Sequence, residues 1–400
     1  MRVLITGGGT AGHVNPALAI ADIIMRKEPD SVVEYVGTEK GIEGRLVAKR
    51  GMKLHAIEVM GLRRSLSFAN FRAFTLALRS RKKCKKIIVD FTPDVVIGTG
   101  GYVCWPLISA AASMGIPTVL HESNAEPGFA VKMLKNQADL ILVNFESTKN
   151  FLRGGKSRVE RVGMPVAGEF NVRNRNSSRA HISAPVRCNG EGTWEESASA
   201  CSDALKMPCE GVNHEVRILS FGGSLGAQTL NLCVLELIKE IATRDPKVYI
   251  EHSCGTRWYN EFSAIMKENG FDKLPNVSAR DYIYDMPKKM AEADVVICRS
   301  GAATLAEIAV AQKAAILIPS PNVTGDQQRK NARQLADQQA AIVLEDATAK
   351  DEIVDVVKNL IRDRKRIMDL EERVGAFAVR DCDEKIYEAI SSLVKKEKMT

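Results

Sequence analysis

The sequence lacks any hydrophobic run long enough to cross a membrane. Nowhere in its 400 residues does an uninterrupted apolar stretch approach the ~18–20 residues of a spanning helix. The first glycine run begins at Gly7, which leaves no room before it for the apolar region of a signal peptide. We therefore expect a protein that is made and kept in the cytoplasm.

Metal-binding patterns are also missing. The nine cysteines include no C-x-x-C pair, and structural zinc sites depend on such close spacing. Most of the cysteines stand in apolar or helical stretches, where a free thiol packs as a small hydrophobe. No Walker-type lysine loop occurs either. We expect neither a metal nor an organic cofactor.

Acidic residues are almost absent from one segment. Residues 45–86 contain thirteen Lys or Arg and a single acid, Glu58, so this segment carries +12 while the whole chain carries +7. The rest of the chain therefore sums to −5. Basic character confined to one segment indicates a local anionic partner. Since no nucleic-acid module or aromatic stacking platform accompanies it, we expect no nucleic-acid binding.

What the sequence does contain is an alternation of strand and helix patterns. A β-branched run at Met1–Thr6, a glycine turn and a helical pattern at Pro16–Ile24 open the chain, and the same device restarts at Val216–Phe221. Strands that alternate with helices favour parallel sheets with right-handed crossovers. At ~150 residues per domain, the length predicts two or three domains, and the repeated device indicates two α/β halves that each look doubly wound.

The expected domain boundaries follow changes in this pattern. From about residue 168 the periodicity collapses into a polar stretch, as in a linker or insertion. We predict a first domain over residues 1–167, an irregular segment over 168–214, a second domain over 215–375 and a C-terminal helix over 376–400. The last helix is expected to return to the first domain.

The turn Gly7–Gly12 fits G-x-G-x-x-G between a strand and a helix. Its glycines let backbone N–H groups approach a phosphate, and the helix N-terminus favours negative charge. A nicotinamide or flavin site would need an acid at the end of the second strand, where Val36-Gly37-Thr38 offers none. His13 follows the turn, either as a base for a substrate hydroxyl or as a structural residue at the helix start.

Two further turns, in the second half, present N–H groups at helix starts. They are Gly222–Ala227 and Arg299–Thr304. Glu307, expected on the first turn of the following helix, either accepts hydrogen bonds from two ribose hydroxyls or complements the helix dipole. Gln327 and Gln328 offer neutral amides, which suit sugar hydroxyls. Together these parts predict a nucleotide-sugar enzyme that holds its ligand between two sheets.

Five motifs carry a family resemblance: Thr6–Ala19, Gly98–Pro106, Gly115–Gly128, Arg299–Glu307 and Asp326–Ala332. In them the sequence resembles the bacterial transferases that add N-acetylglucosamine to undecaprenyl-pyrophosphoryl-N-acetylmuramyl-pentapeptide in peptidoglycan synthesis. The resemblance covers nearly the whole chain outside the irregular segment. It implies two Rossmann-like domains facing across a cleft, the GT-B architecture, and an inverting, metal-independent transfer from UDP-N-acetylglucosamine.

Matched motif by motif, the resemblance assigns roles to individual residues. His13 is expected as the catalytic base or an essential acceptor-side group, with Glu122 as a second catalytic candidate. Expected contacts with the UDP-sugar come from turns, helix starts and amides of both domains: Thr10, Ala11, Gly12, Asn124, Ser224, Ile283, Ala302, Ala303, Thr304, Leu305, Ala306, Glu307, Gln327 and Gln328. Among these, Ile283 would hold uracil through its backbone.

Four positions depart from the family pattern. Ala11 stands where glycine is frequent, which requires a negative φ, and Ser123 and Leu225 stand where glutamine is common. Ala167 ends a Gly-Met-Pro-Val-Ala run that lacks the usual asparagine and arginine. These departures bear on catalytic efficiency more than on fold.

The basic segment contains an amphipathic helical pattern, with apolar side chains within about a third of the circumference at ~100° per residue. The apolar residues and their flanking cations are Phe68, Phe71, Phe74, Leu78, Arg79, Lys82 and Lys83. The pattern fits either a face that docks on anionic lipid or an ordinary helix with its aromatic side chains in the core. The resemblance favours peripheral docking at the cytoplasmic face of the cell membrane, with the lipid-linked acceptor and cell-wall synthesis proteins as partners.

Three other functions use similar parts. A glycosyltransferase with another acceptor would share the donor motifs but differ in the loops of the first domain. A UDP-N-acetylglucosamine epimerase would need carboxylate acid–base pairs and no acceptor, and a non-catalytic scaffold would tolerate loss of His13. Release of UDP only in the presence of the lipid acceptor separates them.

Overall fold

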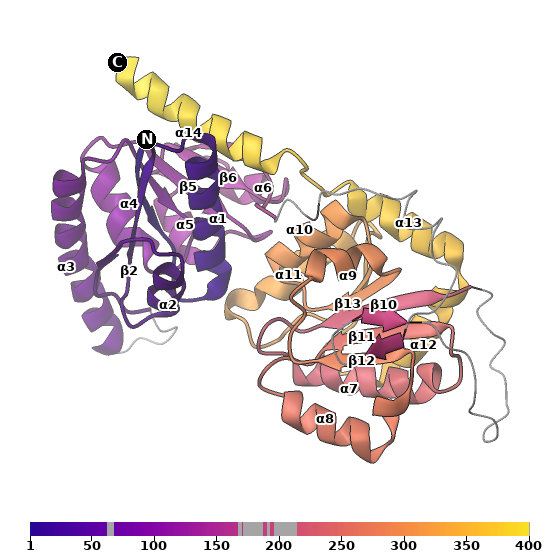
Figure 1. The fold of residues 1–400 in the computed structure, drawn as a ribbon. Coiled ribbons are helices and arrows are strands. Elements are labelled where there is room, and N and C mark those ends of the chain that lie inside the picture. The colour runs from indigo at the N-terminus through magenta and orange to yellow at the C-terminus, as the bar shows by residue number, and fades with distance from the viewer. Residues whose placement is uncertain (62–67, 167–169, 171–186, 190–192, 196–213, 400) are drawn as a thin grey trace. The chain divides into compact units, whose positions relative to one another are not determined.

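The computed structural model describes residues 1–61, 68–166, 170, 187–189, 193–195 and 214–399. The chain forms two compact units (Figure 1). The first comprises Met1–Val166, Gly301–Ala306 and Val379–Thr400, and the second comprises Ala167–Ser300 and Glu307–Ala378. The irregular segment predicted over residues 168–214 lies almost entirely outside the described residues.

The first unit is built on a seven-stranded parallel sheet in the order β3-β2-β1-β4-β5-β6-β7. Its strands are β1 (Arg2–Thr6), β2 (Val32–Gly37), β3 (Leu54–Ala56), β4 (Val95–Gly98), β5 (Thr118–Glu122), β6 (Leu140–Val143) and β7 (Arg158–Arg161). The central strands are apolar throughout because helices cover both faces of the sheet. The strand order reverses between β1 and β4, and ligands of open α/β sheets bind at such a point, beyond the carboxyl ends of the strands.

Successive strand residues point into two separate cores. On one face α1 (Ala11–Lys27), α2 (Ile42–Lys49) and α14 (Cys382–Met399) pack against the sheet. On the other lie α3 (Phe68–Phe91), α4 (Cys104–Ala112), α5 (Phe129–Leu134) and α6 (Thr148–Leu152). Helices α3 to α6 therefore form one layer, in which α4 contacts both α3 and α5.

The last helix, α14, is part of the first unit and lies alongside α1 (Figure 1). Its Ile386 and Ile390 are fully buried in the shared core, and each such side chain contributes roughly 1.5–3 kcal/mol by leaving water. Ion pairs join Arg26 to Asp383 and Lys27 to the following Glu384. Because exposed pairs are worth only about 0–1 kcal/mol, apolar burial is the main attachment.

The second unit has a six-stranded parallel sheet in the order β12-β11-β10-β13-β14-β15. Its strands are β10 (Val216–Phe221), β11 (Val248–Ser253), β12 (Val277–Arg280), β13 (Val295–Cys298), β14 (Ala314–Leu317) and β15 (Ile342–Val343). Its helices are α7 (Gln228–Leu237), α8 (Tyr259–Glu268), α9 (Met286–Glu292), α10 (Ala302–Ala311), α11 (Gln327–Ala336), α12 (Ala349–Arg362) and α13 (Arg364–Gly375). The strand order reverses between β10 and β13.

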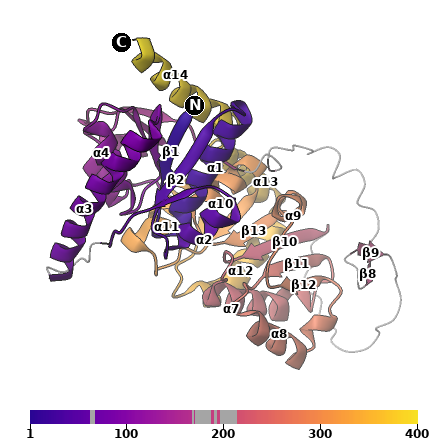
Figure 2. The same ribbon diagram turned by 60° about the vertical axis from the view of Figure 1, so that its left-hand side comes forward.

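A small antiparallel ribbon, β8 (Arg187–Asn189) with β9 (Thr193–Glu195), is the described part of the irregular segment (Figure 2). Among the described helices, none combines the length and the apolar character that crossing a bilayer requires. The prediction of an α/β fold with two Rossmann-like parallel sheets is confirmed.

Candidate active site

His13 lies on the first turn of α1, at the carboxyl end of β1. Its Nδ1 is 3.1 Å from the carbonyl oxygen of Thr99, and the Thr99 hydroxyl donates in return to the His13 carbonyl at 2.6 Å. Since a carbonyl only accepts, Nδ1 must carry the proton. The Nε2 nitrogen is then left as an unprotonated acceptor, which is the form that a general base requires.

The charge state of His13 agrees with this tautomer. Burial lowers the pKa of His13 below its usual value, although the hydrogen bond to Thr99 acts in the opposite direction. A lowered pKa keeps the imidazole neutral at pH 7. The N-cap residue of α1 is Thr10, so His13 does not occupy the capping position considered for it as a structural alternative.

Glycines after β4 make room for the imidazole. A Cβ on Gly100 would lie 2.7 Å from Nδ1 of His13, and a Cβ on Gly101 would lie 2.1 Å from the Gly8 carbonyl oxygen. Both glycines have positive φ, +105° and +81°, which side chains rarely adopt. The glycine turns after β1 and β4 therefore fit together only without side chains, and they hold His13 at the point where the strand order reverses.

The candidate contacts beside His13 are accessible. Thr10 and Gly12 are exposed and Ala11 is half-buried. Ala11 is the first residue of α1 and has no positive φ, so the alanine fits where the family often has glycine. Helix α1 has no acid in its first turn, which leaves its N-terminal N–H groups open to an anion.

Glu122 ends β5 and is buried, and both of its carboxylate oxygens are already bound. Oε1 accepts from the Asn124 backbone and side-chain amides at 2.9 and 3.1 Å, and Oε2 accepts from the Gly128 N–H at 2.7 Å. Burial raises the pKa of Glu122, while these hydrogen bonds oppose the rise. The arrangement ties the loop that carries Asn124 to the end of β5.

Two helix starts follow β10 and β13, the strands between which the order of the six-stranded sheet reverses. The turn after β10 leads into α7, whose N-cap Ala227 provides no side-chain cap and whose first turn has no acid. Ser224 is exposed at the tip of this turn, with its carbonyl bound by the Thr256 N–H at 3.2 Å. Helix α10, which carries the candidates Ala302–Glu307, also has no acid in its first turn. Both starts suit a diphosphate.

Glu307 is the sixth residue of α10, beyond the first turn on which we expected it. The helix dipole acts mainly within that turn, so the dipole interpretation does not apply. Within the described residues its carboxylate has no hydrogen bond or ion pair, and burial raises its pKa to about 7. A half-buried acid without a partner is costly, which suits a carboxylate that meets ligand hydroxyls.

The two glutamines at the start of α11 differ in whether the side-chain amide oxygen has a hydrogen-bond partner. Oε1 of Gln328 accepts from the Ser320 N–H at 2.8 Å, which leaves its amide nitrogen as the free end. Oε1 of Gln327 is buried without a partner. Buried polar atoms are rarely left unpaired, so Gln327 is the stronger candidate for a ligand contact.

Ile283, in the loop between β12 and α9, has a buried side chain. No hydrogen bond involves its backbone N–H or C=O within the described residues, which is what backbone recognition of a base would need. Tyr282 and Tyr284 flank it as an edge-to-face pair with ring centroids 4.9 Å apart.

The outer surface of α3 differs from that of a helix with a buried aromatic stripe. Phe71, Phe74 and Leu78 are 65%, 56% and 42% exposed, and the flanking Arg79, Lys82 and Lys83 are exposed as well. The residues that α3 buries lie further along, among them Cys84 and Ile88. The side chain of Phe68 lies outside the described set. The exposure favours the docking interpretation over the core alternative.

Two buried polar residues escaped the sequence analysis. Glu43 lies beneath the first glycine turn, where its carboxylate accepts from Thr38 and faces Gly8. His121 donates through Nε2 to the Gly163 carbonyl at 3.0 Å, and burial lowers its pKa to about 4. Only the tertiary contacts reveal these roles: Glu43 belongs to no recognisable local pattern, and His121 lies within the Gly115–Gly128 motif but was assigned no role there.

The remaining departures are placed as follows. Ser123 is buried with its hydroxyl unpaired, and Leu225 is exposed at the tip of the turn after β10. Ala167 lies outside the described residues. An exposed leucine beside Ser224 cannot provide the hydrogen bonds that a glutamine offers there.

Family models match both halves of the chain. Residues 3–143 match the glycosyltransferase family 28 N-terminal domain, and residues 217–386 match the glycosyltransferase family 28 C-terminal domain. The two matches together span most of the chain, which therefore belongs to the glycosyltransferases of family 28.

Curated relatives identify a more specific family within the glycosyltransferases. The chain is 36% identical, over 99% of both chains, to the UDP-N-acetylglucosamine–N-acetylmuramyl-(pentapeptide) pyrophosphoryl-undecaprenol N-acetylglucosamine transferase of Acetivibrio thermocellus. It is 33% identical to the enzyme of the same name from Lactococcus lactis subsp. lactis, over 99% of this chain and 100% of the relative. The chain therefore belongs to the family of these N-acetylglucosamine transferases.

Comparison with solved structures supports the same family. The crystal structure of Acinetobacter baumannii MurG superposes with a TM-score of 0.72 at 25% identity, covering 98% of this chain and 99% of that one. A putative UDP-N-acetylglucosamine 2-epimerase from Listeria monocytogenes superposes with a TM-score of 0.63 at 12% identity, covering 99% and 97%. The second likeness shows the fold alone.

Proposed function

We propose that the chain transfers N-acetylglucosamine from UDP-N-acetylglucosamine to the 4-hydroxyl of undecaprenyl-pyrophosphoryl-N-acetylmuramyl-pentapeptide, with inversion and without a metal ion. Family membership supports the reaction. The observation that carries the mechanism is the neutral imidazole of His13, whose Nδ1 proton is committed to Thr99 and whose Nε2 is the free acceptor.

His13 acts as the general base. The acceptor hydroxyl attacks the anomeric carbon from the face opposite UDP, and Nε2 of His13 takes its proton as the new glycosidic bond forms. The charge on the resulting imidazolium is offset by the hydrogen bond from Nδ1–H to the Thr99 carbonyl. Glu122 keeps Asn124 in place and takes no proton from substrate, because both of its oxygens are bound within the chain.

The helices that follow β10 and β13 stabilise the leaving group. The N-termini of α7 and α10 bind the diphosphate, on which negative charge grows as the sugar departs. Glu307 accepts from the ribose hydroxyls, and the backbone of Ile283 pairs with uracil. Gln327 and Gln328 read the sugar hydroxyls. Each of these groups is a contact that UDP-N-acetylglucosamine can satisfy and that the unliganded chain leaves open.

Docking at the membrane brings the enzyme to its acceptor. Phe71, Phe74 and Leu78 enter the interface of the cytoplasmic leaflet, while Arg79, Lys82 and Lys83 meet anionic headgroups. Peripheral binding of this kind places the first unit near a lipid-linked sugar without a spanning helix. Cell-wall synthesis proteins at the same surface are further partners.

The test is UDP release by the purified protein from UDP-N-acetylglucosamine, with and without the undecaprenyl-linked muramyl-pentapeptide. Acceptor-dependent release together with a lipid-linked disaccharide product is the expected result. Conversion of the donor to its 2-epimer without acceptor would instead indicate the isomerase that shares this fold. Bound donor with no acceptor-dependent release would refute the proposed reaction.

A further inference from the structure

Helices α5 and α6 expose apolar side chains close to one another, on the same layer of the first unit as α3. Phe129 and Met133 of α5 are 66% and 46% exposed, and Phe151 of α6 is 43% exposed. The ammonium of Lys132, on the same side of α5, lies 5.9 Å from the centre of the Phe151 ring. Clustered apolar exposure with an adjacent cation is typical of a contact surface rather than of an ordinary protein surface.

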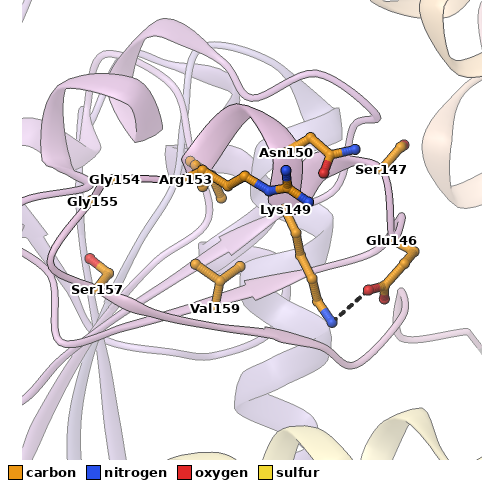
Figure 3. A pocket seen from close by; sticks show the side chains of 10 residues that line it. Glu146, Ser147, Lys149, Asn150, Arg153, Gly154, Gly155, Ser157 and Val159 are labelled. Atoms are coloured by element: carbon orange, nitrogen blue, oxygen red, sulfur yellow. Dashed lines mark ion pairs between the residues drawn. The ribbon is translucent and has the colours of Figure 1, made fainter.

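A hollow of about 560 Å³ borders α6. Residues that follow β6, form or follow α6, and begin β7 line it (Figure 3): Glu146, Ser147, Lys149, Asn150, Leu152, Arg153, Gly154, Gly155, Ser157 and Val159. The hollow lies toward the β7 edge of the sheet, about three strand spacings or ~14 Å from β1 and the turn before His13. It is therefore distant from His13, while α6 itself contacts the Asn124 loop through the Thr148 hydroxyl, which donates to the Asn124 carbonyl at 3.2 Å.

The lining of the hollow is rich in hydrogen-bond donors. Its single acid, Glu146, is already paired with the Lys149 ammonium at 2.8 Å. Arg153 is exposed at the rim and has no ion pair or hydrogen bond within the described residues, and the Ser147 hydroxyl is buried without a partner. An exposed guanidinium without a partner, beside a hollow whose only acid is already paired, favours an anion with several oxygens, such as a phosphate.

The charge of this region fits an anionic partner. Residues 129–161 contain seven Lys or Arg and three acids, a net +4. Of the acids, Asp139 accepts from the Thr118 N–H and hydroxyl, and Glu160 is paired with Arg158. With the +12 of residues 45–86, the remainder of the chain sums to −9. Positive charge is therefore concentrated in two segments that contribute to one helical layer.

We propose that the α5–α6 surface, comprising Phe129, Lys132, Met133, Phe151 and the hollow beside Arg153, is a second contact with an anionic phospholipid bilayer. The hollow takes a lipid phosphate, and the three apolar side chains enter the interface next to it. The proposal rests on the membrane docking through α3 given above. Two contacts separated by α4 fix the orientation of the first unit on the bilayer, whereas a single helix leaves it free to rotate.

A bilayer accounts for this surface better than an acidic protein does. Apolar side chains, interleaved cations and a hollow beside a free guanidinium are three features that an interfacial lipid contact uses together. Removal of one cation at an anionic surface is worth ~1 kcal/mol, about fivefold in vesicle affinity, and reversal of its charge has a larger effect.

The experiment is sedimentation of the full-length protein with vesicles of phosphatidylcholine, with and without phosphatidylglycerol. The variant Arg153→Glu tests the hollow, and Phe129→Ser with Phe151→Ser tests the apolar part. The control Lys267→Glu changes an exposed cation on α8, outside both basic segments. We expect Arg153→Glu and the double variant each to weaken binding to the anionic vesicles about tenfold and the control to leave it unchanged. Activity on a soluble, short-chain acceptor should stay at the wild-type level.

Comparison with Phe71→Ser and Phe74→Ser separates this proposal from the proposed function. Loss of binding in the α3 variants alone would overturn the second contact and leave docking through α3 intact. Unchanged binding in all variants would overturn both. The last measurement is titration of the wild type and Arg153→Glu with inorganic phosphate. If the variant loses phosphate binding but keeps vesicle binding, the hollow is a site for a soluble anion and the lipid assignment is refuted.

Discussion

Replacement of Glu307 by glutamine is predicted to stabilise the second unit and to weaken UDP binding at the same time. Burial raises the pKa of Glu307 from 4.5 to about 7, and no partner within the described residues compensates its charge. A folded-state pKa above the unfolded value means that the folded chain holds the proton more tightly. Stability is therefore highest below pH 4.5, decreases as the pH rises, and carries the full cost of the buried charge above pH 7.

The size of the stability change follows from the difference between the folded and unfolded pKa values of Glu307. About 2.5 pH units at 1.36 kcal/mol each set an upper limit of about 3 kcal/mol for the gain in unfolding free energy of Glu307→Gln at pH 8. The gain should shrink as the pH is lowered and vanish near pH 4.5. In the proposed complex the carboxylate accepts from ribose hydroxyls, and hydrogen bonds to charged groups contribute ~1.5–3 kcal/mol. UDP affinity at pH 8 should therefore fall about tenfold to a hundredfold.

The assay combines urea denaturation between pH 5 and pH 8 with calorimetric titration of UDP. Glu268→Gln, on the exposed surface of α8, is the matched control and should change neither quantity. A variant that is less stable than the wild type at pH 8 would refute the argument that the charge is uncompensated. Unchanged UDP affinity would remove Glu307 from the ribose site, and the two results are independent of each other.

Three further predictions concern the first unit. His13→Ala should lower turnover by about 10²- to 10⁴-fold with UDP binding retained, and unchanged turnover would exclude His13 as the base. In the wild type, the decline of kcat/KM on acidification should have its midpoint below pH 6.5, because burial lowers the pKa of His13. Gly100→Ala, whose methyl would press on the imidazole at 2.7 Å, should reduce turnover at least ~tenfold, whereas Gly115→Ala, which also has positive φ but open space, should cost stability alone. Glu43→Ala should lower the free energy of unfolding by about 1–3 kcal/mol, because it leaves Thr38 donors unpaired; equal urea midpoints would contradict this.

The sequence predicts the fold and the location of His13 well because both depend on short-range chemistry. A glycine turn between a buried strand and a helix forces the chain to reverse at the sheet edge, and the residue that follows must lie on the first helical turn. The positive φ values of Gly100 and Gly101 extend the same logic to the second glycine turn. Local composition suffices wherever backbone geometry dictates which residue is tolerated.

The roles that sequence reasoning left open depend on contacts between distant segments. Whether Glu122 is free to take a proton depends on how the following loop folds back to Asn124 and Gly128. The stripe of Phe71 and Phe74 looks the same whether it faces a core or water, because periodicity records a face and not what covers it. Glu43 carries no motif at all, and only the packing of α2 under the glycine turn gives it a function.

The return of α14 to the first unit makes the second unit an insertion within the first. A ribosome releases residues 1–166 long before Cys382–Met399, so the nascent first unit must wait, with one side of its sheet lacking Ile386 and Ile390, until the end of translation. The order of synthesis and the order of completion are thus opposite: the unit that begins first can be finished only last. Loss of the last twenty residues would therefore impair the N-terminal half of the molecule more than the neighbouring C-terminal half.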